Sequence, residues 1–400
     1  MPSTRHPRVA VVAEFYPSLR DPVLGVWAHR QAIAARDAGA EVRVLVLHRL
    51  VPPKAALAGG PMVAWKALSE RLREPHAQSR DGLHVSYVPF VSPPRERSYP
   101  TWGSWAAGPL SIALRRLRSS FPFDLIHAHN AVPAGEAVRL ARIRMPLVVS
   151  VHGGDVLYTA IRSQAGGQAV ARGLGAARLV LANSQGIAEL SRAHGAQETR
   201  VVHLGTDLPE IQRSGRSERP ATLVTVAHLV ARKRHADVLR ALAVLGDRHP
   251  QLRYEIIGDG PERETLEALA ARLEVAERVE FLGQLEPGEA VERARRCTLM
   301  VMPSTEEAFG VAYIEAMAGG VPAIGCRGEP GPEEIAAAGD GFMLVPPGDI
   351  ERLTQRIDEL LSDPQRLREA SQRARQTVAA HFTWEHCGEQ TLTAYEHALL

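Results

Sequence analysis

Two glutamates eight positions apart are the first residues whose type and spacing point to chemistry. They are Glu307 and Glu315, in the stretch STEEAFGVAYIEAMAGG that runs from Ser304 to Gly320. A short apolar strand pattern precedes this stretch, and a helix is expected to begin near residues 309–310. The start of a helix presents unpaired backbone N–H groups and the positive end of the helix dipole. A phosphate group is therefore stabilised there without a cationic side chain.

The residues of this stretch match the parts of one extended ligand. Gly310 lets a ligand approach the backbone closely. Glu315, over one turn into the helix, offers two oxygens to the vicinal hydroxyls of a ribose, and Glu307 offers the same to a sugar beyond the phosphates. The order ribose, diphosphate, sugar is that of a sugar nucleotide. A simpler interpretation is an acidic residue that stabilises a helix start, which fits Glu306 but not the mid-helix Glu315.

Strand and helix patterns alternate along the chain and must position these residues. Strand–helix alternation predicts an α/β fold with parallel sheets and helices on both faces, here as two doubly wound domains. The expected strands are 8–15, 41–47, 83–90, 124–129, 146–152, 178–184 and 199–205 in the first half, and 221–229, 252–260, 278–283, 298–304, 322–326 and 342–347 in the second.

A polar stretch without apolar periodicity, Pro209 to Ala221, separates the two halves. We therefore expect an N-terminal domain at 1–208, a linker at 209–220 and a C-terminal domain at 221–382. Ligands of open α/β sheets bind beyond the carboxyl ends of the strands. No GxGxxG motif follows a strand, and the lone GDG at 258–260 is typical of a tight turn, which disfavours a nicotinamide enzyme.

Composition narrows the class of protein. Four hundred residues with 45% apolar content predict two domains, and a net charge of +2 disfavours nucleic-acid binding. The three cysteines form no CxxC pair, which fits a reducing compartment and neither a disulfide framework nor a thiolate metal site. We expect neither a signal peptide nor a membrane-spanning helix, and hence a cytoplasmic protein.

The chain resembles the retaining glycosyltransferases of family 4, which have the GT-B fold: two Rossmann-like domains facing each other across a cleft. The segment PSTEEAFGVAYIEAMAGGVPAIG is similar to the donor-site motif of that family, in which seven residues separate two glutamates. Other resembling segments, in the family's order, are VVAEFYP, GVWAHRQAIAARDAGAEVRVL, DLIHAHNAVPAG, VVSVHGGDVL, LVLANSQGIAEL, VVHLGTDL, IIGDGPERETLEALAARLEVAERVEFLGQL and VPPGDIERLTQRIDELLSDP. The terminal HFTWEHCGEQTLTAYEHALL resembles the family's last helix, so residues 383–400 are expected to cross back to the first domain.

The resemblance implies roles for the donor side. Lys233 matches the family lysine that contacts the donor diphosphate, and a compact ammonium is a good phosphate partner. His228 stands where the family usually has an arginine, so part of the phosphate clamp differs here. The residues expected to bind the donor are His228, Lys233, Glu307, Ala308, Phe309, Gly310 and Glu315.

It also implies roles on the acceptor side. His152, at a strand end, matches a family histidine near the sugar at the reaction centre, and we expect it to be catalytic together with Glu307 and Lys233. Gly25, His129 and Asp155 are the expected acceptor-side residues. The alternative for both residues is a structural role. Gly25 would then be an ordinary turn glycine, and His152 a strand-end histidine whose hydrogen bonds are all made within the protein.

The spacing of His127 and His129 raises the question of a metal. Both point to the same side of a strand, and with His152 they offer three zinc ligands. No carboxylate or cysteine completes the pattern, and the family needs no metal here. The sequence also has no Asp-x-Asp motif, which the metal-bridged donor sites of the other main glycosyltransferase architecture use. We expect no metal and no cofactor other than the sugar nucleotide itself.

The implied reaction transfers a hexose-type sugar with retention at the anomeric carbon. Lys233 and helix N–H groups would stabilise the diphosphate leaving group by preorganised electrostatics. No nucleophile is apparent, so a front-face reaction is expected, in which the leaving phosphate takes the acceptor proton. Two alternatives stay open: a sugar-nucleotide epimerase of the same architecture, and a non-catalytic sugar-nucleotide-binding protein.

The acceptor is less well determined, and a glycan, a glycolipid and a small molecule all fit. Residues 51–120 contain ten lysines and arginines against four acidic residues, with Trp65, Trp102 and Trp105 among them. A basic surface with aromatic residues fits anionic lipid at the inner face of the membrane and a lipid-linked acceptor. A solvated loop and helix face is the alternative.

Overall fold

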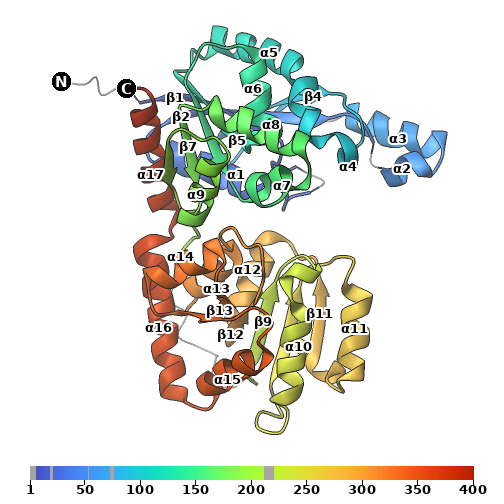
Figure 1. Cartoon of the computed structure of the whole chain (residues 1–400), viewed down its shortest axis with the longest axis vertical. Coiled ribbons are helices and arrows are strands. Elements are labelled where there is room, and N and C mark those ends of the chain that lie inside the picture. The colour runs from blue at the N-terminus through green and yellow to red at the C-terminus, as the bar shows by residue number, and fades with distance from the viewer. Residues whose placement is uncertain (1–5, 19–20, 53, 73–75, 211–219) are drawn as a thin grey trace. The chain divides into compact units, whose positions relative to one another are not determined.

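The structure, a computed structural model, describes residues 6–18, 21–52, 54–72, 76–210 and 220–400, without the side chains of Lys54, Ala55 and Arg97. The predicted linker at 209–220 lies mostly outside these residues. The chain forms two compact units, shown in Figure 1. Unit 1 comprises Met1–His203 and Cys387–Leu400, and unit 2 comprises Leu204–His386.

Unit 1 is built on an eight-stranded sheet of order β3-β4-β2-β1-β5-β6-β7-β8. All neighbours pair in parallel except β3, which is antiparallel to β4 at the sheet edge. The strands are β1 (Arg8–Ala13), β2 (Glu41–Arg49), β3 (Ala77–Arg80), β4 (Leu83–Phe90), β5 (Leu125–His129), β6 (Leu147–Val151), β7 (Leu179–Ala182) and β8 (Thr199–Val201).

Helices cover this sheet, and the last helix of the chain belongs to the unit from Cys387 onward. The α-helices are α1 (Val26–Asp37), α2 (Lys54–Ala58), α3 (Pro61–Leu72), α4 (Arg95–Ser98), α5 (Trp102–Ser120), α6 (Glu136–Ala141), α7 (Ala160–Arg162), α8 (Gln164–Gly175), α9 (Gln185–Ala193) and α17 (Trp384–Ala398). Shorter helical turns are η1 (Tyr99–Thr101), η2 (Ala131–Gly135) and η3 (Gly154–Thr159).

Unit 2 is built on a six-stranded parallel sheet of order β11-β10-β9-β12-β13-β14. Its strands are β9 (Thr222–Val226), β10 (Arg253–Ile257), β11 (Val279–Gly283), β12 (Leu299–Val301), β13 (Ala323–Cys326) and β14 (Phe342–Val345). Its helices are η4 (Ala231–Lys233), α10 (His235–Val244), α11 (Arg263–Arg272), η5 (Ala276–Arg278), α12 (Pro287–Arg296), α13 (Val311–Ala318), α14 (Pro330–Ala338), α15 (Ile350–Leu361) and α16 (Pro364–His381).

The central strands are apolar on both faces, because helices pack on both sides of a parallel sheet. Every residue of β5, β6 and β7 is buried, as is every residue of β12 and β13. In unit 2, Tyr254, Ile256 and Leu223 lie in one core with the apolar face of α10. This burial fixes the strand ends, from which the polar loops project.

The GDG turn after β10 has a packing role that matches its interpretation as a tight turn. Gly258 has a φ of +139°, and a Cβ there would lie 2.0 Å from the carbonyl oxygen of Ala227. A Cβ on Gly260 would lie 2.5 Å from the carbonyl oxygen of Leu229. The two glycines therefore let the loop after β10 pack against the loop after β9.

The predicted fold class is confirmed, and each predicted strand is present within or near its expected range. Strand β3 was not predicted, since AQSR has neither apolar alternation nor β-branched residues. One expectation was wrong: Trp102 is only 4% exposed and packs against Phe90 and Tyr99, so it is part of the core rather than of a basic surface. In the described part of the chain, no helix is both long and apolar enough to cross a membrane.

Candidate functional site

The two-glutamate stretch connects β12 to α13 in unit 2. Helix α13 begins at Val311, directly after the predicted start, and Gly310 is its N-cap with a φ of +90°. Glycine is required at this position because the backbone is left-handed and a Cβ would lie 2.3 Å from the Tyr313 ring. The loop therefore turns sharply into the helix, and its amide groups lie at the positive end of the helix dipole.

Lys233 and Glu307 form the ion pair at the centre of the site. The Lys233 ammonium donates to Glu307 Oε2 at 2.5 Å, and each side chain is only 11% exposed. The Ser304 hydroxyl donates to the same carboxylate oxygen at 2.9 Å. A cation and a carboxylate, both sheltered from water, are thus held beside the start of α13.

The backbone of two loops brings this pair together. Lys233 ends the turn η4 after β9, and Arg234, with a φ of +56°, is the N-cap of α10. The Thr305 N–H in the loop after β12 donates to the Arg232 carbonyl at 2.8 Å. Because β9 and β12 are adjacent parallel strands, their carboxyl ends bring both loops to the same edge of the sheet.

Helix α14 supports the Glu307 loop from the other side. The Glu307 N–H donates to Glu329 Oε2 at 2.9 Å, and the Gly331 N–H donates to the Glu307 carbonyl at 3.1 Å. A Cβ on Gly331 would lie 2.1 Å from the Phe309 Cα, so the two segments are in direct backbone contact. Burial raises the pKa of Glu329, and the backbone N–H groups of Glu307 and Glu306 oppose that rise.

The other predicted donor residues lie along the same segment. Val311, Ala312 and Glu315 are half-buried, whereas Tyr313 and Ile314 are buried, so Glu315 lies on the accessible side of α13. Ala308 and Phe309 are buried, and the Phe309 ring packs against Phe382 at 5.7 Å. The contribution of these two residues to a ligand would therefore come from their backbone.

His228 occupies a separate position near the carboxyl end of β9. His228 is exposed to solvent, and its backbone carbonyl accepts a hydrogen bond from the Val230 N–H at 2.9 Å. Next to it, His235 is buried at the start of α10. Burial lowers the pKa of His235 to about 4, and electrostatic interaction with Lys233 and His228 lowers it further. His235 is therefore neutral at physiological pH.

In unit 1, His129 and His152 lie at the carboxyl ends of β5 and β6. His129 Nδ1 lies 3.0 Å from His152 Nε2, with the two ring planes parallel to within 3°. The remaining nitrogens, His129 Nε2 and His152 Nδ1, are buried without a hydrogen-bond partner. Burial lowers the pKa of His152 to about 3 and that of His129 well below its usual value, so both rings are neutral.

His127 belongs to a structural contact and not to this pair. Its Nδ1 lies 2.8 Å from the Tyr395 hydroxyl on α17, and its Nε2 lies 2.8 Å from the Ser150 hydroxyl. Both nitrogens are thus occupied. Among the described residues, no group of three His, Cys, Asp or Glu side chains is placed to hold a metal ion.

Asp155 and Gly25, two of the predicted acceptor-side residues, have clear local roles. The Asp155 carboxylate is 1% exposed and accepts from the Asn130 amide and the Val132 N–H, both at 3.1 Å, so it holds the loop after β5. Burial raises its pKa to about 6 despite these bonds. Gly25 has a φ of +74°, and a Cβ there would lie 2.2 Å from the Phe15 backbone.

Three candidates were not named individually from the sequence, although Glu329 lies in the segment GEPGPEEI, which resembles a glycine-rich loop of the family that faces the donor. Ser304 and Glu329 bond directly to Glu307, and Glu14 lies in a buried cluster after β1. The Tyr99 hydroxyl donates to Glu14 Oε2 at 2.8 Å, and Arg95 lies 3.5 Å from Oε1. Burial raises the pKa of Glu14 to about 7. The sequence signal was a charged residue at the end of an apolar strand for Glu14 and a Glu-Pro-Gly helix start for Glu329.

The structure thus gathers Lys233, Glu307 and the start of α13 at one edge of unit 2, with Glu315 further along α13. His129, His152, Asp155 and Gly25 all lie in unit 1.

Known proteins match the chain along nearly its whole length. Residues 208–377 match the family described as Glycosyl transferases group 1, and residues 24–210 match Glycosyltransferase Family 4. The chain is 30% identical over 368 residues to D-inositol 3-phosphate glycosyltransferase 1 of Catenulispora acidiphila, with 84% of this chain and 85% of that protein covered. It is 29% identical over 292 residues to N-acetyl-alpha-D-glucosaminyl L-malate synthase of Bacillus anthracis, with 69% of this chain and 75% of that protein covered.

Solved structures share the fold. Sucrose-phosphate synthase from Thermosynechococcus elongatus superposes with a TM-score of 0.76 at 21% identity, covering 98% of this chain and 99% of that one. Anabaena HepE in complex with UDP-glucose superposes with a TM-score of 0.69 at 20% identity, and the superposition covers 98% of this chain and 100% of that one. The fold and the family matches define a glycosyltransferase of the GT-B class. The chain belongs to glycosyltransferase family 4.

Proposed function

We propose that this glycosyltransferase transfers a hexose-type sugar from a nucleotide diphosphate sugar to an acceptor hydroxyl, with retention at the anomeric carbon. The observation that supports the proposal is the sheltered Lys233–Glu307 ion pair at the amino end of α13. The ammonium and the helix start suit a diphosphate, and the carboxylate suits sugar hydroxyls. The likeness to HepE, whose structure contains UDP-glucose, also favours a nucleotide-sugar donor.

Each residue has a defined role in this proposal. Lys233 and the backbone at residues 308–310 bind the diphosphate, and arrival of the phosphate separates the ammonium from Glu307. Glu307 then accepts from hydroxyls of the transferred sugar, and Glu315 accepts from the ribose hydroxyls. His152 forms a hydrogen bond with the sugar or the acceptor through its unpartnered Nδ1. His228 lies where a second phosphate contact is usual.

The chemical step exchanges one bond at the anomeric carbon. The bond from that carbon to the diphosphate oxygen breaks, and a bond to the acceptor oxygen forms on the same face. The acceptor proton passes to the leaving phosphate oxygen. Lys233 and the dipole of α13 stabilise the negative charge that develops on the diphosphate, as preorganised groups that need no rearrangement. The transfer as proposed needs no metal and no additional cofactor.

The two units divide the work in this proposal. The N-terminal domain, up to about residue 208, carries the acceptor side, and the domain from residue 221 to 382 carries the donor side. The acceptor is a glycan, a glycolipid or a small molecule. A cytoplasmic location, with contact to the inner face of a membrane through residues 51–120, suits a lipid-linked acceptor.

Helix α3 supports the membrane contact, because no residue in it is buried. Met62 is 84% exposed and Trp65 is 67% exposed, and Lys66 lies on the same helix. Apolar side chains beside a basic residue suit the surface of an anionic membrane. Flotation with anionic liposomes tests this contact: binding at low salt that Met62→Ser and Trp65→Ser weaken is expected, and equal flotation of variant and native protein would argue against it.

The donor assignment is tested with a panel of sugar nucleotides. We expect one class, such as GDP-mannose, UDP-glucose or UDP-N-acetylglucosamine, to raise the melting temperature, and Glu307→Gln to abolish most transfer. Glu306→Gln is the matched control, because Glu306 is exposed beside Glu307. Conversion of the donor without any acceptor would identify an epimerase instead. If the chain binds the donor without turning it over, and Glu307→Ala binds the donor equally well, the protein is a non-catalytic binding protein.

A further inference from the structure

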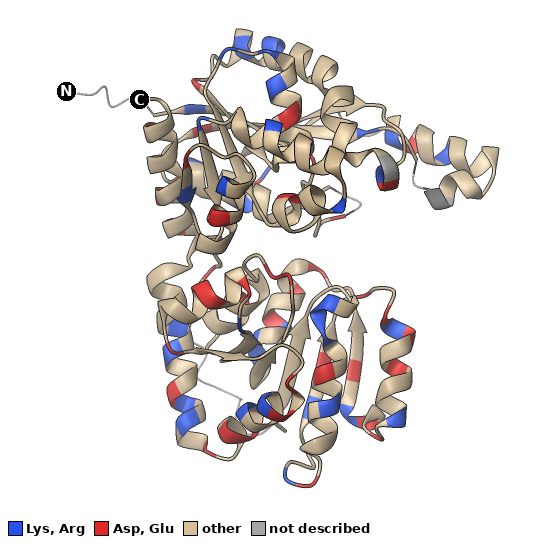
Figure 2. Cartoon of the chain, viewed as in Figure 1, with Lys and Arg blue, Asp and Glu red and all other residues tan. Residues whose placement is uncertain are grey.

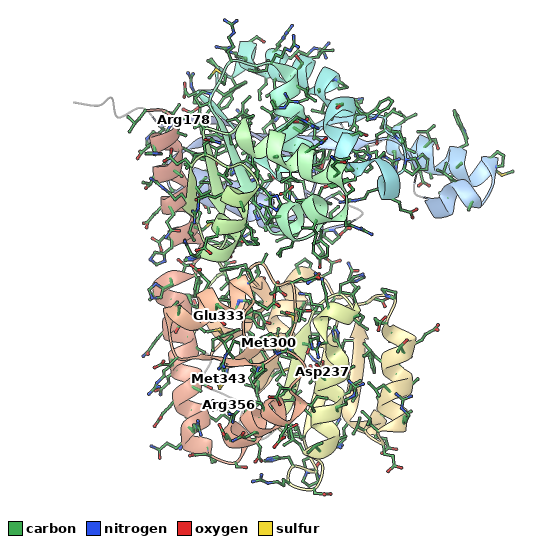
Figure 3. The ribbon with its side chains drawn as sticks, viewed as in Figure 1. Arg178, Asp237, Met300, Glu333, Met343 and Arg356 are labelled. Carbon is green, nitrogen blue, oxygen red and sulfur yellow. The ribbon has the colours of Figure 1, made fainter. Side chains whose placement is uncertain are left out.

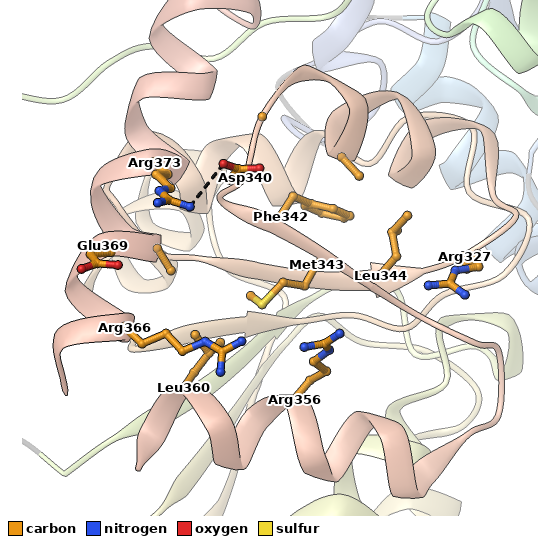
Figure 4. A pocket seen from close by; sticks show the side chains of 13 residues that line it. Arg327, Asp340, Phe342, Met343, Leu344, Arg356, Leu360, Arg366, Glu369 and Arg373 are labelled. Carbon is orange, nitrogen blue, oxygen red and sulfur yellow. Dashed lines mark hydrogen bonds and ion pairs between the residues drawn. The ribbon is translucent and has the colours of Figure 1, made fainter. Parts of the chain in front are cut away.

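A cavity of about 530 Å³ lies at the edge of the unit 2 sheet, beside β14. Strand β14 is the outermost strand, and in the described part of unit 2 it pairs with β13 alone. Helices α14, α15 and α16 and the loops after β13 and α14 contribute the rest of the lining, whose side chains Figure 4 draws. Its volume is in the range of sites for small ligands. We call it the edge cavity.

Four arginines line the edge cavity: Arg327, Arg356, Arg366 and Arg373. They come from the loop after β13, from α15 and from α16. Figure 2 marks the charged positions on the ribbon, and Figure 3 labels Arg356. Two acidic residues, Asp340 and Glu369, also line it, which leaves an excess of positive charge.

The ion pairs of these arginines are weak ones. Arg373 lies 3.2 Å from Asp340, and Arg356 and Arg366 share Glu359 at 2.9 and 3.5 Å. The three guanidinium side chains are 54%, 35% and 52% exposed, so solvent screens these ion pairs and they add little to stability. An anion with two or more charges can therefore replace Asp340 or Glu359 as the partner.

The backbone of β14 adds neutral polar groups to the cavity. The carbonyls of Gly341 and Val345 accept from Ala323 and Arg327 on the β13 side. Because backbone groups alternate in direction along a strand, those of Phe342 and Leu344, which line the cavity, point away from β13. Outward N–H and C=O groups beside guanidinium groups can bind hydroxyls and phosphate together.

From this arrangement, we propose that the edge cavity is a second ligand site, for a small phosphate-bearing polyol of the sugar phosphate class. The arginine guanidinium groups bind the phosphate, for which their planar fork is suited. The outward backbone groups of Phe342 and Leu344 bind the hydroxyls. Met343 and Leu360 supply the apolar part of the wall.

Helix α14 connects the edge cavity to the donor motif. Its carboxyl-terminal end places Ala336, Gly339 and Asp340 in the lining of the cavity. Its amino-terminal end places Gly331 against Phe309. There the Glu329 carboxylate accepts from the Glu307 N–H, and the Gly331 N–H donates to the Glu307 carbonyl. A ligand that draws Arg373 away from Asp340 therefore acts next to the carboxyl-terminal end of a nine-residue helix, whose amino-terminal end contacts the Glu307 loop. Regulation of the donor site rests on the proposed function, whereas anion binding in the edge cavity does not.

Calorimetric titration of the full chain with glucose 6-phosphate tests the site, with glucose and inorganic phosphate as separate arms. We expect saturable binding of glucose 6-phosphate that is about tenfold or more weaker in Arg356→Ala and in Arg366→Ala. Arg356→Lys keeps the positive charge but lacks the planar guanidinium. Its affinity for glucose 6-phosphate should therefore lie between those of the native chain and Arg356→Ala. Arg368→Ala is the matched control, since Arg368 is exposed on α16 outside the cavity lining, and it should bind like the native chain.

Three outcomes would overturn the site: no saturable binding at millimolar concentration, equal binding by Arg356→Ala and Arg368→Ala, or equal binding of glucose. Preferential binding of an acidic peptide would assign the β14 edge to a protein partner instead. Hydrogen exchange tests the coupling separately, and the ligand should slow exchange in peptides that contain Glu307 and Gly331. Binding without slower exchange would support the ligand site but contradict its coupling to the donor motif. Neither measurement depends on transferase activity.

Discussion

His129 Nδ1 lies 3.0 Å from His152 Nε2, so the two neutral rings share a single hydrogen bond. One ring must donate and the other accept, because burial keeps both pKa values far below neutrality. The tautomer of His129 therefore fixes that of His152. This decides whether His152 Nδ1, which is buried without a partner, offers a proton or a lone pair.

His129→Phe should retain a ring but remove this bond, so that His152 populates both tautomers. We expect kcat to fall about tenfold, with a smaller change in KM for the donor. Nitrogen-15 shifts of the imidazoles should show one tautomer of His152 in the native chain and a mixture in the variant. His84→Phe, at an exposed position of β4, is the control. A single unchanged tautomer in His129→Phe would contradict the coupling.

Lys233→Ala should weaken the binding of a nucleoside diphosphate about ten- to one-hundred-fold, because it removes a charged hydrogen-bond donor from a sheltered site. Lys233→Arg should bind better than Lys233→Ala but less well than the native chain, since the larger guanidinium differs in shape and reach from the ammonium. Titration calorimetry with UDP and GDP measures the effect. Lys66→Ala, the same change in unit 1, should leave both affinities unchanged; a similar loss there would exclude a specific phosphate contact.

Glu14 should make the native chain less stable as pH rises. Burial raises the pKa of Glu14 from 4.5 to about 7, opposed by Arg95 and Tyr99 and assisted by the charge of Asp155. Between these pH values the folded state retains a proton that the unfolded state has lost. The free energy of unfolding therefore falls as pH rises from about 4.5 to about 7, by roughly 3 kcal/mol in total.

Glu14→Gln removes this titration and keeps an acceptor for Tyr99. Urea unfolding of both proteins at pH 5 and pH 8, followed by tryptophan fluorescence, measures the difference. The variant should gain stability relative to the native chain at the higher pH. Asp155, whose pKa burial raises to about 6, is present in both proteins, so its own titration contributes to both pH dependences. Parallel pH dependence in the two proteins would rule out an elevated Glu14 pKa.

Gly331→Ala should destabilise unit 2 by about 1–3 kcal/mol, because its Cβ would lie 2.1 Å from the Phe309 Cα. Donor affinity should fall as well, since the change displaces the loop that carries Glu307. Gly288→Ala is a matched control: both glycines follow the proline that begins a helix, and a Cβ on Gly288 meets nothing within 4 Å. Chemical unfolding should show Gly288→Ala unchanged or slightly more stable, and equal effects at both glycines would refute the backbone contact.

Much of the fold was predictable because it rests on local patterns. Apolar β-branched runs bounded by helical periodicity marked the parallel strands of both sheets, and Gly310 marked the start of α13. The exception, β3, is a polar edge strand whose pairing with β4 depends on the neighbouring strand and not on its own composition. Trp102 likewise shows that residue type alone does not determine burial: it lies within a basic segment yet packs in the core.

The sequence by itself determined the residue types and the spacing of the donor motif, since Glu307 lies in the loop before α13 and Glu315 lies within that helix. Only the tertiary structure decided that Lys233 meets Glu307, 74 positions away, and that His127 meets Tyr395, 268 positions away. For the first contact the reason is the strand order: β9 lies beside β12, so loops distant in sequence leave adjacent strand ends. For the second contact the reason is that residues Cys387–Leu400 belong to unit 1. Which partners those loops acquire depends on sheet pairing and burial, and neither is encoded in a local stretch of residues.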